Sequence, residues 1–431
     1  MTFFLKGLQE AYGVEDQIQS LLERAERDCE PFFREISGTV ECNQFKVLRC
    51  FQKNGVADFH LNGSTGYGYG DSGRDVLERI FADVFRAEKA ITRLQIVSGT
   101  HAIALGMLGN LKQGDELVSA TGRPYDTLLK VIGEGGEEGS LAGYGVNYKE
   151  VPLRPDGKID LDKLRESITF RTRMVFFQRS RGYCWRPSFS VRDLSEAISA
   201  VKSLRPEIIC FVDNCYGEFV ELSEPCEAGA DLVAGSLIKN PGGGLALTGG
   251  YLAGKREYIE RAAARLTAPG IGMDVGASLN FNRSAFQGLF LAPLVVGEAL
   301  KGAVLAARFF QLLGYKVLPA YDEQRTDIIQ AVCLDDKELM KAFARGIQKA
   351  SPLDSHVSPE PAPLPGYEHE IIMAGGTFVQ GSSIELSADG PAQPPYNIYL
   401  QGGLSLGHVK IGLALAAQEM EKARKHHKEA N

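Results

Sequence analysis

The feature that most constrains the fold is a regular alternation of short apolar stretches with helical stretches between about residues 90 and 255. Parallel strands need long crossover connections, which usually contain a helix, so this alternation is typical of a parallel sheet covered by helices. We therefore expect an α/β fold with a large, mostly parallel sheet. The expected strands are Leu94–Val97, Glu116–Val118, Met174–Phe177, Ile208–Val212 and Asp231–Val233.

The remainder of the chain is expected to form flanking segments. Residues 1–60 are predicted to be an N-terminal helical segment, 61–290 the large domain with the sheet, and 291–431 a linking helix followed by a small α+β domain. Within the first part, helix is expected over 1–35 and irregular, glycine-rich chain over 36–74. In the small domain, strands are expected at Ile328–Cys333, Glu370–Ala374 and Ser383–Leu386, and helices at Lys337–Lys349 and Gly407–Arg424.

Composition argues against several classes of protein. Of the 431 residues, 44% are apolar and 23% charged, and the net charge is −7, so we expect a globular chain with neither nucleic acid nor an anionic membrane as its main partner. The eight cysteines include no Cys-x-x-Cys pair, which favours reduced thiols over disulfides or zinc, and we expect no metal site. The N-terminus has no apolar signal region, and Leu289–Leu313 carries three charges, so we expect a core helix and a cytoplasmic protein.

Two polar residues follow neighbouring strands of the expected sheet. Asp213 ends one apolar strand, and Lys239 comes 26 residues later, just beyond the next strand, a separation of about one strand–helix–strand unit. Both would lie at the carboxyl edge, where open α/β sheets bind ligands. An amine and a carboxylate placed together suit pyridoxal phosphate, because the amine forms a Schiff base and the carboxylate keeps the pyridine nitrogen protonated. The alternative is a helix-capping aspartate and a surface lysine, which the glycines at 242–244 disfavour.

A phosphate-binding turn is also expected. The strand Leu94–Val97 leads into Ser98, Gly99 and Thr100, and an apolar helix follows. The exposed N–H groups and positive dipole at such a helix start bind phosphate well. The alternative is an ordinary helix cap by Ser98 or Thr100.

Together these stretches resemble fold-type I pyridoxal-phosphate enzymes, which have the aspartate aminotransferase-like fold with a seven-stranded-type sheet. They resemble in particular the Cys/Met-metabolism family of cystathionine lyases and synthases and methionine gamma-lyase. That family carries V-D-N, then G-A-D-(L/I)-V and S-x-x-K, and this chain has Val212-Asp213-Asn214, Gly229–Val233 and Ser236-x-x-Lys239. The stretch 235–244 is most similar to the methionine gamma-lyase-like, aluminium-resistance branch. The resemblance implies that residues 61–290 form the pyridoxal-phosphate domain.

The resemblance also implies roles for individual residues. Lys239 would bind the cofactor and act as the general base, and Tyr125 would stack on the ring and assist proton transfer. The other cofactor contacts would be Asp213 on the pyridine nitrogen, Gln178 at the ring oxygen, Ser98, Gly99, Thr100 and Ser236 on the phosphate, and Tyr67 or Tyr69 on the phosphate of a neighbouring subunit. The alternative for Tyr125 is a core aromatic residue.

The sequence departs from the family pattern in three places. Gly68 and Tyr69 follow Tyr67 where the family has Tyr-x-Arg, and Ile238 rather than threonine precedes the lysine. The C-terminal stretch 396–404 lacks the arginine that usually binds the substrate carboxylate. The residues that could replace it are Arg181, Arg283 and Arg325.

The resemblance implies a lyase that eliminates a thiol from a sulfur-containing amino acid, of the cystathionine beta-lyase or methionine gamma-lyase type. It further implies a homodimer or a dimer of dimers. The alternatives are an aminotransferase, decarboxylase or racemase with the same cofactor, and a non-catalytic regulatory protein that keeps the fold.

Overall fold

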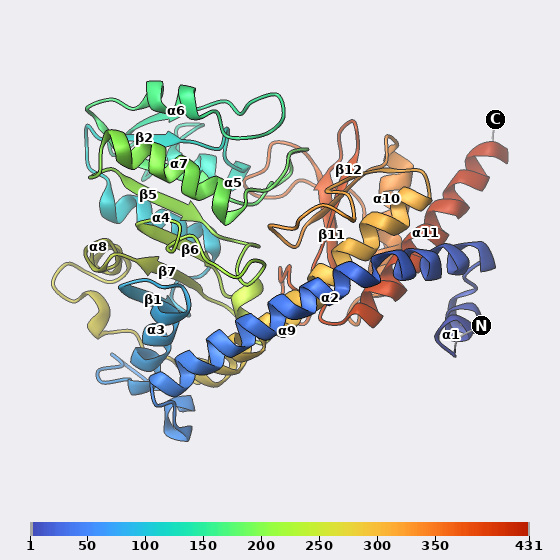
Figure 1. Cartoon of the computed structure of the whole chain (residues 1–431), viewed down its shortest axis with the longest axis horizontal. Helices are drawn as coiled ribbons and strands as arrows, with labels where there is room; N and C mark the ends of the chain where they lie inside the picture. The colour runs from blue at the N-terminus through green and yellow to red at the C-terminus, as the bar shows by residue number, and fades with distance from the viewer. Residues whose placement is uncertain (1–2, 430–431) are drawn as a thin grey trace. The chain divides into compact units, whose positions relative to one another are not determined.

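The computed structural model of the protein describes residues 3–429, and the chain divides into two compact units (Figure 1). The large unit is formed by residues 41–293, and the small unit by residues 1–40 with 294–431. The two boundaries fall inside the long helices α2 (Asp16–Lys53) and α9 (Phe281–Leu312). The described residues before position 41 are thus grouped with the C-terminal part of the chain.

The large unit is built on a seven-stranded sheet with the order β1-β7-β6-β5-β4-β2-β3. The neighbouring strands β6, β5, β4, β2 and β3 all run parallel to one another. Strand β7 runs antiparallel to both of its neighbours, β1 and β6. The predicted large, mostly parallel sheet is therefore confirmed. Its strands are β1 (Lys89–Arg93), β2 (Glu116–Ser119), β3 (Asn147–Glu150), β4 (Thr172–Gln178), β5 (Ile209–Asp213), β6 (Leu232–Ser236) and β7 (Gly250–Gly254).

Helices cover both faces of this sheet. Its helices are α3 (Ser72–Val84), α4 (Gly99–Asn110), α5 (Asp126–Ile132), α6 (Leu161–Ser167), α7 (Val191–Leu204) and α8 (Arg256–Leu266), with short 3-10 turns at Asp58–Leu61, Asn240–Gly242 and Gly272–Asp274. Apolar side chains of α4, α5 and α8 share one buried cluster with Leu252 of β7. Tyr251, the residue before Leu252 in β7, points to the opposite face of the sheet. There its ring contacts the rings of Phe81 in α3 and Phe85 at the end of that helix. The sheet is therefore buried on both faces, as a mostly parallel sheet requires.

Three local predictions were wrong. Leu94–Val97 is a turn that follows β1, closed by a bond from Ile96 N–H to the Arg93 carbonyl, because the pairing with β7 ends at Arg93. Residues 36–53 are helical, since the buried side chains of Asn43 and Val47 extend one face of α2. Ser383–Leu386 is not a strand: its apolar side chains are buried, but strand pairing begins only at Ser387.

The small unit contains a five-stranded antiparallel sheet, ordered β10-β11-β12-β9-β8. Helices α10 and α11 share one apolar core with this sheet and with α1, the start of α2 and the end of α9. The elements of this unit are α1 (Phe3–Tyr12), β8 (Lys316–Leu318), β9 (Gln330–Cys333), α10 (Lys337–Lys349), β10 (Ile371–Ala374), β11 (Ser387–Pro391), β12 (Asn397–Gln401) and α11 (Leu406–Glu429).

Among the described residues, α9 is the one helix that is long and apolar enough to cross a membrane. In its most apolar 18-residue window, 72% of the residues are buried inside the protein. Core helices of soluble proteins show the same length, apolar composition and burial, and the sequence predicts a core helix here.

Candidate active site

Asp213 and Lys239 lie in the large unit at the carboxyl ends of adjacent strands. Asp213 is the last residue of β5, and Lys239 follows the end of β6 by three residues. Asp213 is 5% exposed, and one of its carboxylate oxygens accepts a 3.1 Å bond from the Cys215 N–H. Burial raises the pKa of Asp213, and the nearby positive charge of Lys239 opposes that change. The carboxylate and the amine are thus close enough to influence one another's ionisation.

The amine of Lys239 lies over an aromatic ring. Its Nζ is 4.0 Å from the centroid of the Tyr216 ring, a favourable position for a cation. Burial acts to lower the pKa of Lys239, but the surrounding acidic groups, Asp213 among them, outweigh burial and hold that pKa well above its ordinary value.

The N-terminus of α4 approaches the end of β6 closely. A Cβ on Gly99 would lie 3.1 Å from Cys215 Sγ and 3.3 Å from Ser236 Cβ, so the contact depends on glycine. Ser98 caps the helix, accepting a 3.0 Å bond from the His101 N–H. The first N–H groups of a helix have no partner within it, and the first residue of this helix, Gly99, lies beside Ser236. This cradle fits a phosphate group, and with Asp213 and Lys239 it fits pyridoxal phosphate.

Tyr125 is held at the same edge by two side chains. Its hydroxyl lies 3.0 Å from Thr100 Oγ1, and its N–H donates a 2.9 Å bond to Gln178 Oε1. Gln178 Nε2 donates in turn to the Ser180 carbonyl at 3.1 Å, so both ends of the Gln178 amide bind backbone. Burial raises the pKa of Tyr125, and the charge of Asp213 raises it further, so the phenol is protonated at neutral pH.

Sequence reasoning missed the turn that follows Asp213. Tyr216 has a φ of 71°, and this unusual backbone conformation accompanies the position of its ring beneath Lys239 Nζ. Cys215 lies against Gly99. The acids Glu218, Glu221 and Glu224 recur every third residue in an otherwise apolar stretch, which is the one sequence signal that could have drawn attention to this turn.

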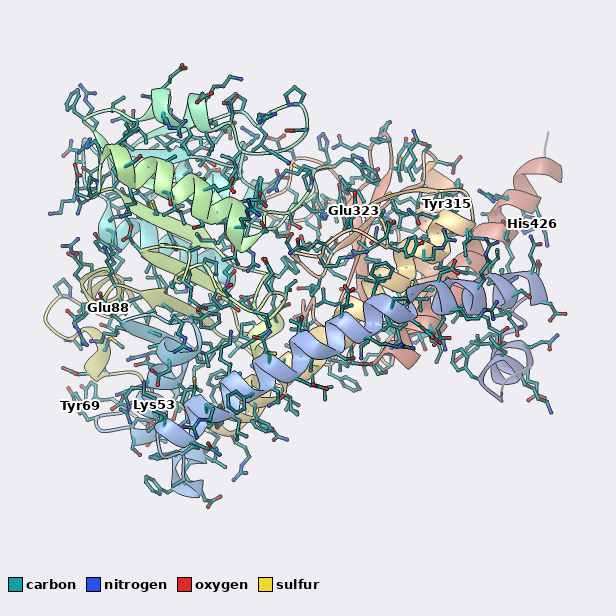
Figure 2. All side chains as sticks on the ribbon, viewed as in Figure 1. Lys53, Tyr69, Glu88, Tyr315, Glu323 and His426 are labelled. Carbon is teal, nitrogen blue, oxygen red and sulfur yellow. The ribbon has the colours of Figure 1, made fainter. Side chains whose placement is uncertain are left out.

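Two predicted residues lie on the surface. Tyr67 and Tyr69 are 73% and 71% exposed, with their rings 5.4 Å apart on the loop before α3. Tyr69 is labelled in Figure 2. Each of these rings contacts the other, and a role of either at the phosphate of a neighbouring subunit stays a prediction.

The three arginines considered for the substrate carboxylate have different environments. Arg181 is 1% exposed, shortly after the end of β4. Arg283 is exposed near the start of α9. Arg325 belongs to the small unit, where one guanidinium nitrogen donates to the Ala303 carbonyl at 3.3 Å. Arg181 is the one that lies near Gln178 in the chain.

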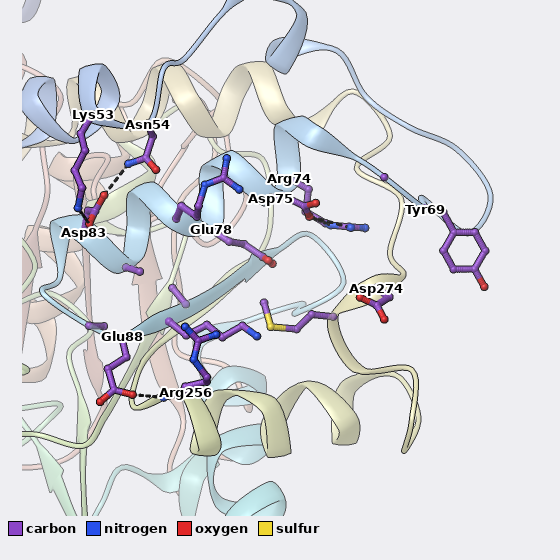
Figure 3. Close-up of a pocket in the computed structure, with 17 residues that line it drawn as sticks. Lys53, Asn54, Tyr69, Arg74, Asp75, Glu78, Asp83, Glu88, Arg256 and Asp274 are labelled. Atoms are coloured by element: carbon purple, nitrogen blue, oxygen red, sulfur yellow. Dashed lines mark hydrogen bonds and ion pairs between the residues drawn. The ribbon is translucent and has the colours of Figure 1, made fainter.

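A separate hollow of about 880 Å³ lies in the large unit among α3, β1 and α8 (Figure 3). Many of its charged groups bind one another or nearby backbone. Lys53 forms an ion pair with Asp83, and Glu88 accepts a 3.0 Å bond from the Arg256 N–H. Acidic and basic side chains both line the hollow, so it does not present charge of a single sign. Of the predicted site residues described by the structure, Tyr69 alone lines it. Within the described part of the chain, no group of three His, Cys, Asp or Glu side chains could hold a metal ion.

Comparison with known proteins connects this site to a family. The sequence model described as methionine gamma-lyase matches residues 18–421. The chain is 52% identical over 397 residues to the uncharacterized protein YnbB of Bacillus subtilis, which covers 92% of this chain and 94% of YnbB.

Solved structures of similar proteins cover nearly the whole chain. A carbon-sulfur lyase involved in aluminum resistance from Clostridium novyi is 46% identical, with a TM-score of 0.93, and the match covers 97% of this chain and 99% of that one. A candidate cystathionine beta-lyase involved in aluminum resistance from Listeria innocua is 50% identical, with a TM-score of 0.91, over 93% of this chain and 98% of the other. The more distant pyridoxal-5'-phosphate dependent protein YhfS from Escherichia coli is 17% identical, with a TM-score of 0.63, over 90% of this chain and 97% of YhfS. These likenesses confirm the predicted fold-type I architecture.

Proposed function

Because the chain belongs to the methionine gamma-lyase family, we propose that it is a pyridoxal-phosphate-dependent carbon–sulfur lyase acting on a sulfur-containing amino acid. The single observation that carries the proposal is the convergence of Asp213, Lys239 and the Gly99 cradle at one edge of the sheet. A helix start for phosphate, a carboxylate for a ring nitrogen and an amine for an aldehyde are the three groups that this cofactor needs.

Each group of the chain would have a defined task. Bound pyridoxal phosphate supplies an electron sink that stabilises negative charge at the substrate Cα. Asp213 would hold a proton on the ring nitrogen through a charge-assisted hydrogen bond. Lys239 Nζ would carry the covalent link to the cofactor and, when released by the substrate amine, would take the proton from Cα as general base.

Tyr125 would provide a second proton-transfer group. Because its phenol stays protonated at neutral pH, Tyr125 can donate a proton to the departing sulfur atom. Thr100 would fix the position of the hydroxyl, and Gln178 would fix the backbone of Tyr125 through its side-chain oxygen. Gln178 would thus orient Tyr125, since its amide already binds backbone at both ends.

The substrate carboxylate and the phosphate group would each need a further partner. We assign the substrate carboxylate to Arg181, which follows the same strand as Gln178. The exposed rings of Tyr67 and Tyr69 support a homodimer, alone or paired with a second dimer, in which each subunit would complete the phosphate site of the other. We also propose a cytoplasmic setting, in which the free cysteines would stay reduced.

The test is an assay for keto acids released from a panel of sulfur amino acids by the cofactor-loaded protein. Pyruvate would identify elimination at Cβ, and 2-oxobutyrate elimination at Cγ. Transfer of the amine to an added keto acid would instead indicate an aminotransferase. An absence of turnover with every amino acid, with the cofactor still bound to Lys239, would contradict the lyase and favour a regulatory protein.

A further inference from the structure

The turn after Asp213 is strained. Tyr216 and Phe219 have φ angles of 71° and 63°, in the left-handed region that residues other than glycine rarely adopt. Backbone of this kind persists only where surrounding contacts enforce it, and such strain is concentrated at functional sites. The contacts that hold this turn therefore bear on how Tyr216 is presented to Lys239.

Buried hydrogen bonds hold the turn from both sides. Arg179 Nη1 donates to Asn214 Oδ1 at 2.7 Å and to the Gly217 carbonyl at 2.9 Å. Asn240, the residue after Lys239, donates from its side chain to the Glu218 carbonyl at 2.9 Å. The segment that carries Lys239 is thus tied directly to the turn that carries Tyr216.

The side chain of Glu218 lies beneath this arrangement and is fully buried. Its Oε1 accepts a 2.9 Å bond from the Tyr251 hydroxyl, and it packs so tightly on β6 that a Cβ on Gly235 would lie 2.5 Å from this oxygen. Within residues 3–429, Glu218 Oε2 has no hydrogen-bond partner. The Tyr251 ring stacks on Phe85 at 4.9 Å, so the surroundings are largely aromatic.

An anion would be poorly stabilised at this position. A buried carboxylate needs hydrogen-bond donors or a close cation at both oxygens, and here one oxygen has neither donor nor ion pair among the described residues. The titratable groups that face Glu218 are Glu224, Tyr251, Lys239 and Cys215. Burial raises the pKa of Glu218 to about 8, and the charge of Glu224 also raises it. The backbone N–H of Glu218 itself, the Tyr251 hydroxyl and the charge of Lys239 oppose the change but do not outweigh burial.

We propose that Glu218 is a positioning residue that acts as an uncharged acid, holding the Tyr251 hydroxyl and the strained turn so that the Tyr216 ring stays beneath Lys239 Nζ. Ionisation of Glu218 would place a negative charge next to Glu224, and repulsion between the two carboxylates would loosen the turn. The effect on Lys239 chemistry rests on the proposed function, whereas the protonation of Glu218 is a property of the protein alone.

The test compares Glu218→Gln with Glu218→Ala in the cofactor-loaded protein and in the protein without cofactor. Glutamine keeps an acceptor for Tyr251 and cannot ionise. Infrared difference spectra of the cofactor-free wild type should show the C=O band of a protonated carboxylic acid at pH 7, lost with a midpoint near pH 8 and absent from E218Q. In the loaded wild type, the visible spectrum of the bound cofactor should change over the same pH range, and E218Q should lack this change.

The turnover rates of the two variants should differ in the same way as their spectra. E218Q should keep turnover at pH 7 within about threefold of wild type, whereas E218A should lose about tenfold or more because the turn is no longer held. If E218A fails to fold, the infrared band and the spectrum of E218Q still decide the question. An E218Q variant that behaves like E218A, or an infrared spectrum without a protonated-acid band that depends on Glu218, would overturn the proposal. A wild type that shows the band and the spectral change but turns over no amino acid would contradict the lyase function alone.

Discussion

Replacing Glu218 with glutamine should remove a loss of stability that the wild-type protein undergoes as the pH rises. The pKa of this carboxyl is raised from 4.5 to about 8 by burial in the folded protein. Between these two values the folded chain keeps a proton that the unfolded chain has released. Stability therefore falls with rising pH, and the contribution of Glu218 is fully present below about pH 4.5 and lost as the pH passes through about 8.

The size of the effect follows from the width of that interval. One pKa unit corresponds to about 1.4 kcal/mol, so the free energy of unfolding of wild type should fall relative to that of E218Q by about 1.4 kcal/mol per pH unit. From pH 5 to pH 8 the difference should reach on the order of 4 kcal/mol. Glutamine also leaves a buried N–H without a partner, at a cost of about 1–3 kcal/mol that does not depend on pH, so the slope is the meaningful quantity.

The assay is urea unfolding followed by circular dichroism at several pH values. One protein concentration is used throughout, because the proposed assembly would make stability depend on concentration. Glu385→Gln is the matched control, since both oxygens of Glu385 accept backbone N–H bonds, from Phe378 at 2.8 Å and Val379 at 3.0 Å. This control should destabilise the protein near neutral pH, because an amide N–H would face a backbone N–H. Parallel pH curves for wild type and E218Q would show that Glu218 is already ionised in the folded protein and would refute the reasoning.

Three further variants, one of them a double variant, test the cofactor site. Gly99→Ala should weaken cofactor binding by about tenfold, because the new Cβ would lie 3.1 Å from Cys215 Sγ and push the helix start away from the phosphate. Equilibrium dialysis measures this affinity. The control is Gly38→Ala, which should leave the affinity unchanged because there is open space around its Cβ. Asp213→Asn should keep the cofactor bound but slow the chemical step by about a hundredfold or more, and wild-type turnover in single-turnover kinetics would contradict its role on the ring nitrogen. The double variant Tyr67→Ala, Tyr69→Ala should bind the cofactor more weakly and still sediment as a dimer. A wild-type protein that is fully active as a monomer in the ultracentrifuge would contradict a phosphate site shared between subunits.

Much of the fold could be predicted because apolar strands in a buried parallel sheet stand out from their surroundings. The strands that carry Asp213 and Ser236 are continuous apolar runs, so their carboxyl ends, and with them Lys239, could be located from spacing alone. The strand before Ser98 was misplaced by a few residues because the chain turns after Arg93, and an apolar turn resembles an apolar strand.

The positions of Tyr216 and Glu218 around the site could not be predicted from the sequence, because they depend on tertiary packing. The positive φ of Tyr216 leaves no mark in the sequence, since the residue is not glycine. Glu218 contacts Tyr251 across 33 residues of chain and packs on Gly235 of a different strand. Contacts of this kind follow from how strands pair, and no motif spacing encodes them.

The most direct test of the account is to locate the cofactor on the chain. The protein loaded with pyridoxal phosphate should be yellow, and borohydride should make the linkage irreversible, so that digestion and mass spectrometry find the adduct on Lys239. Lys255 is the matched comparison, because it lies next along the chain after a strand end but forms a 2.8 Å ion pair with Asp231 and is half exposed. An adduct on Lys239 that disappears in Lys239→Ala and persists in Lys255→Ala is the predicted result, and an adduct on any other lysine would contradict the assigned site.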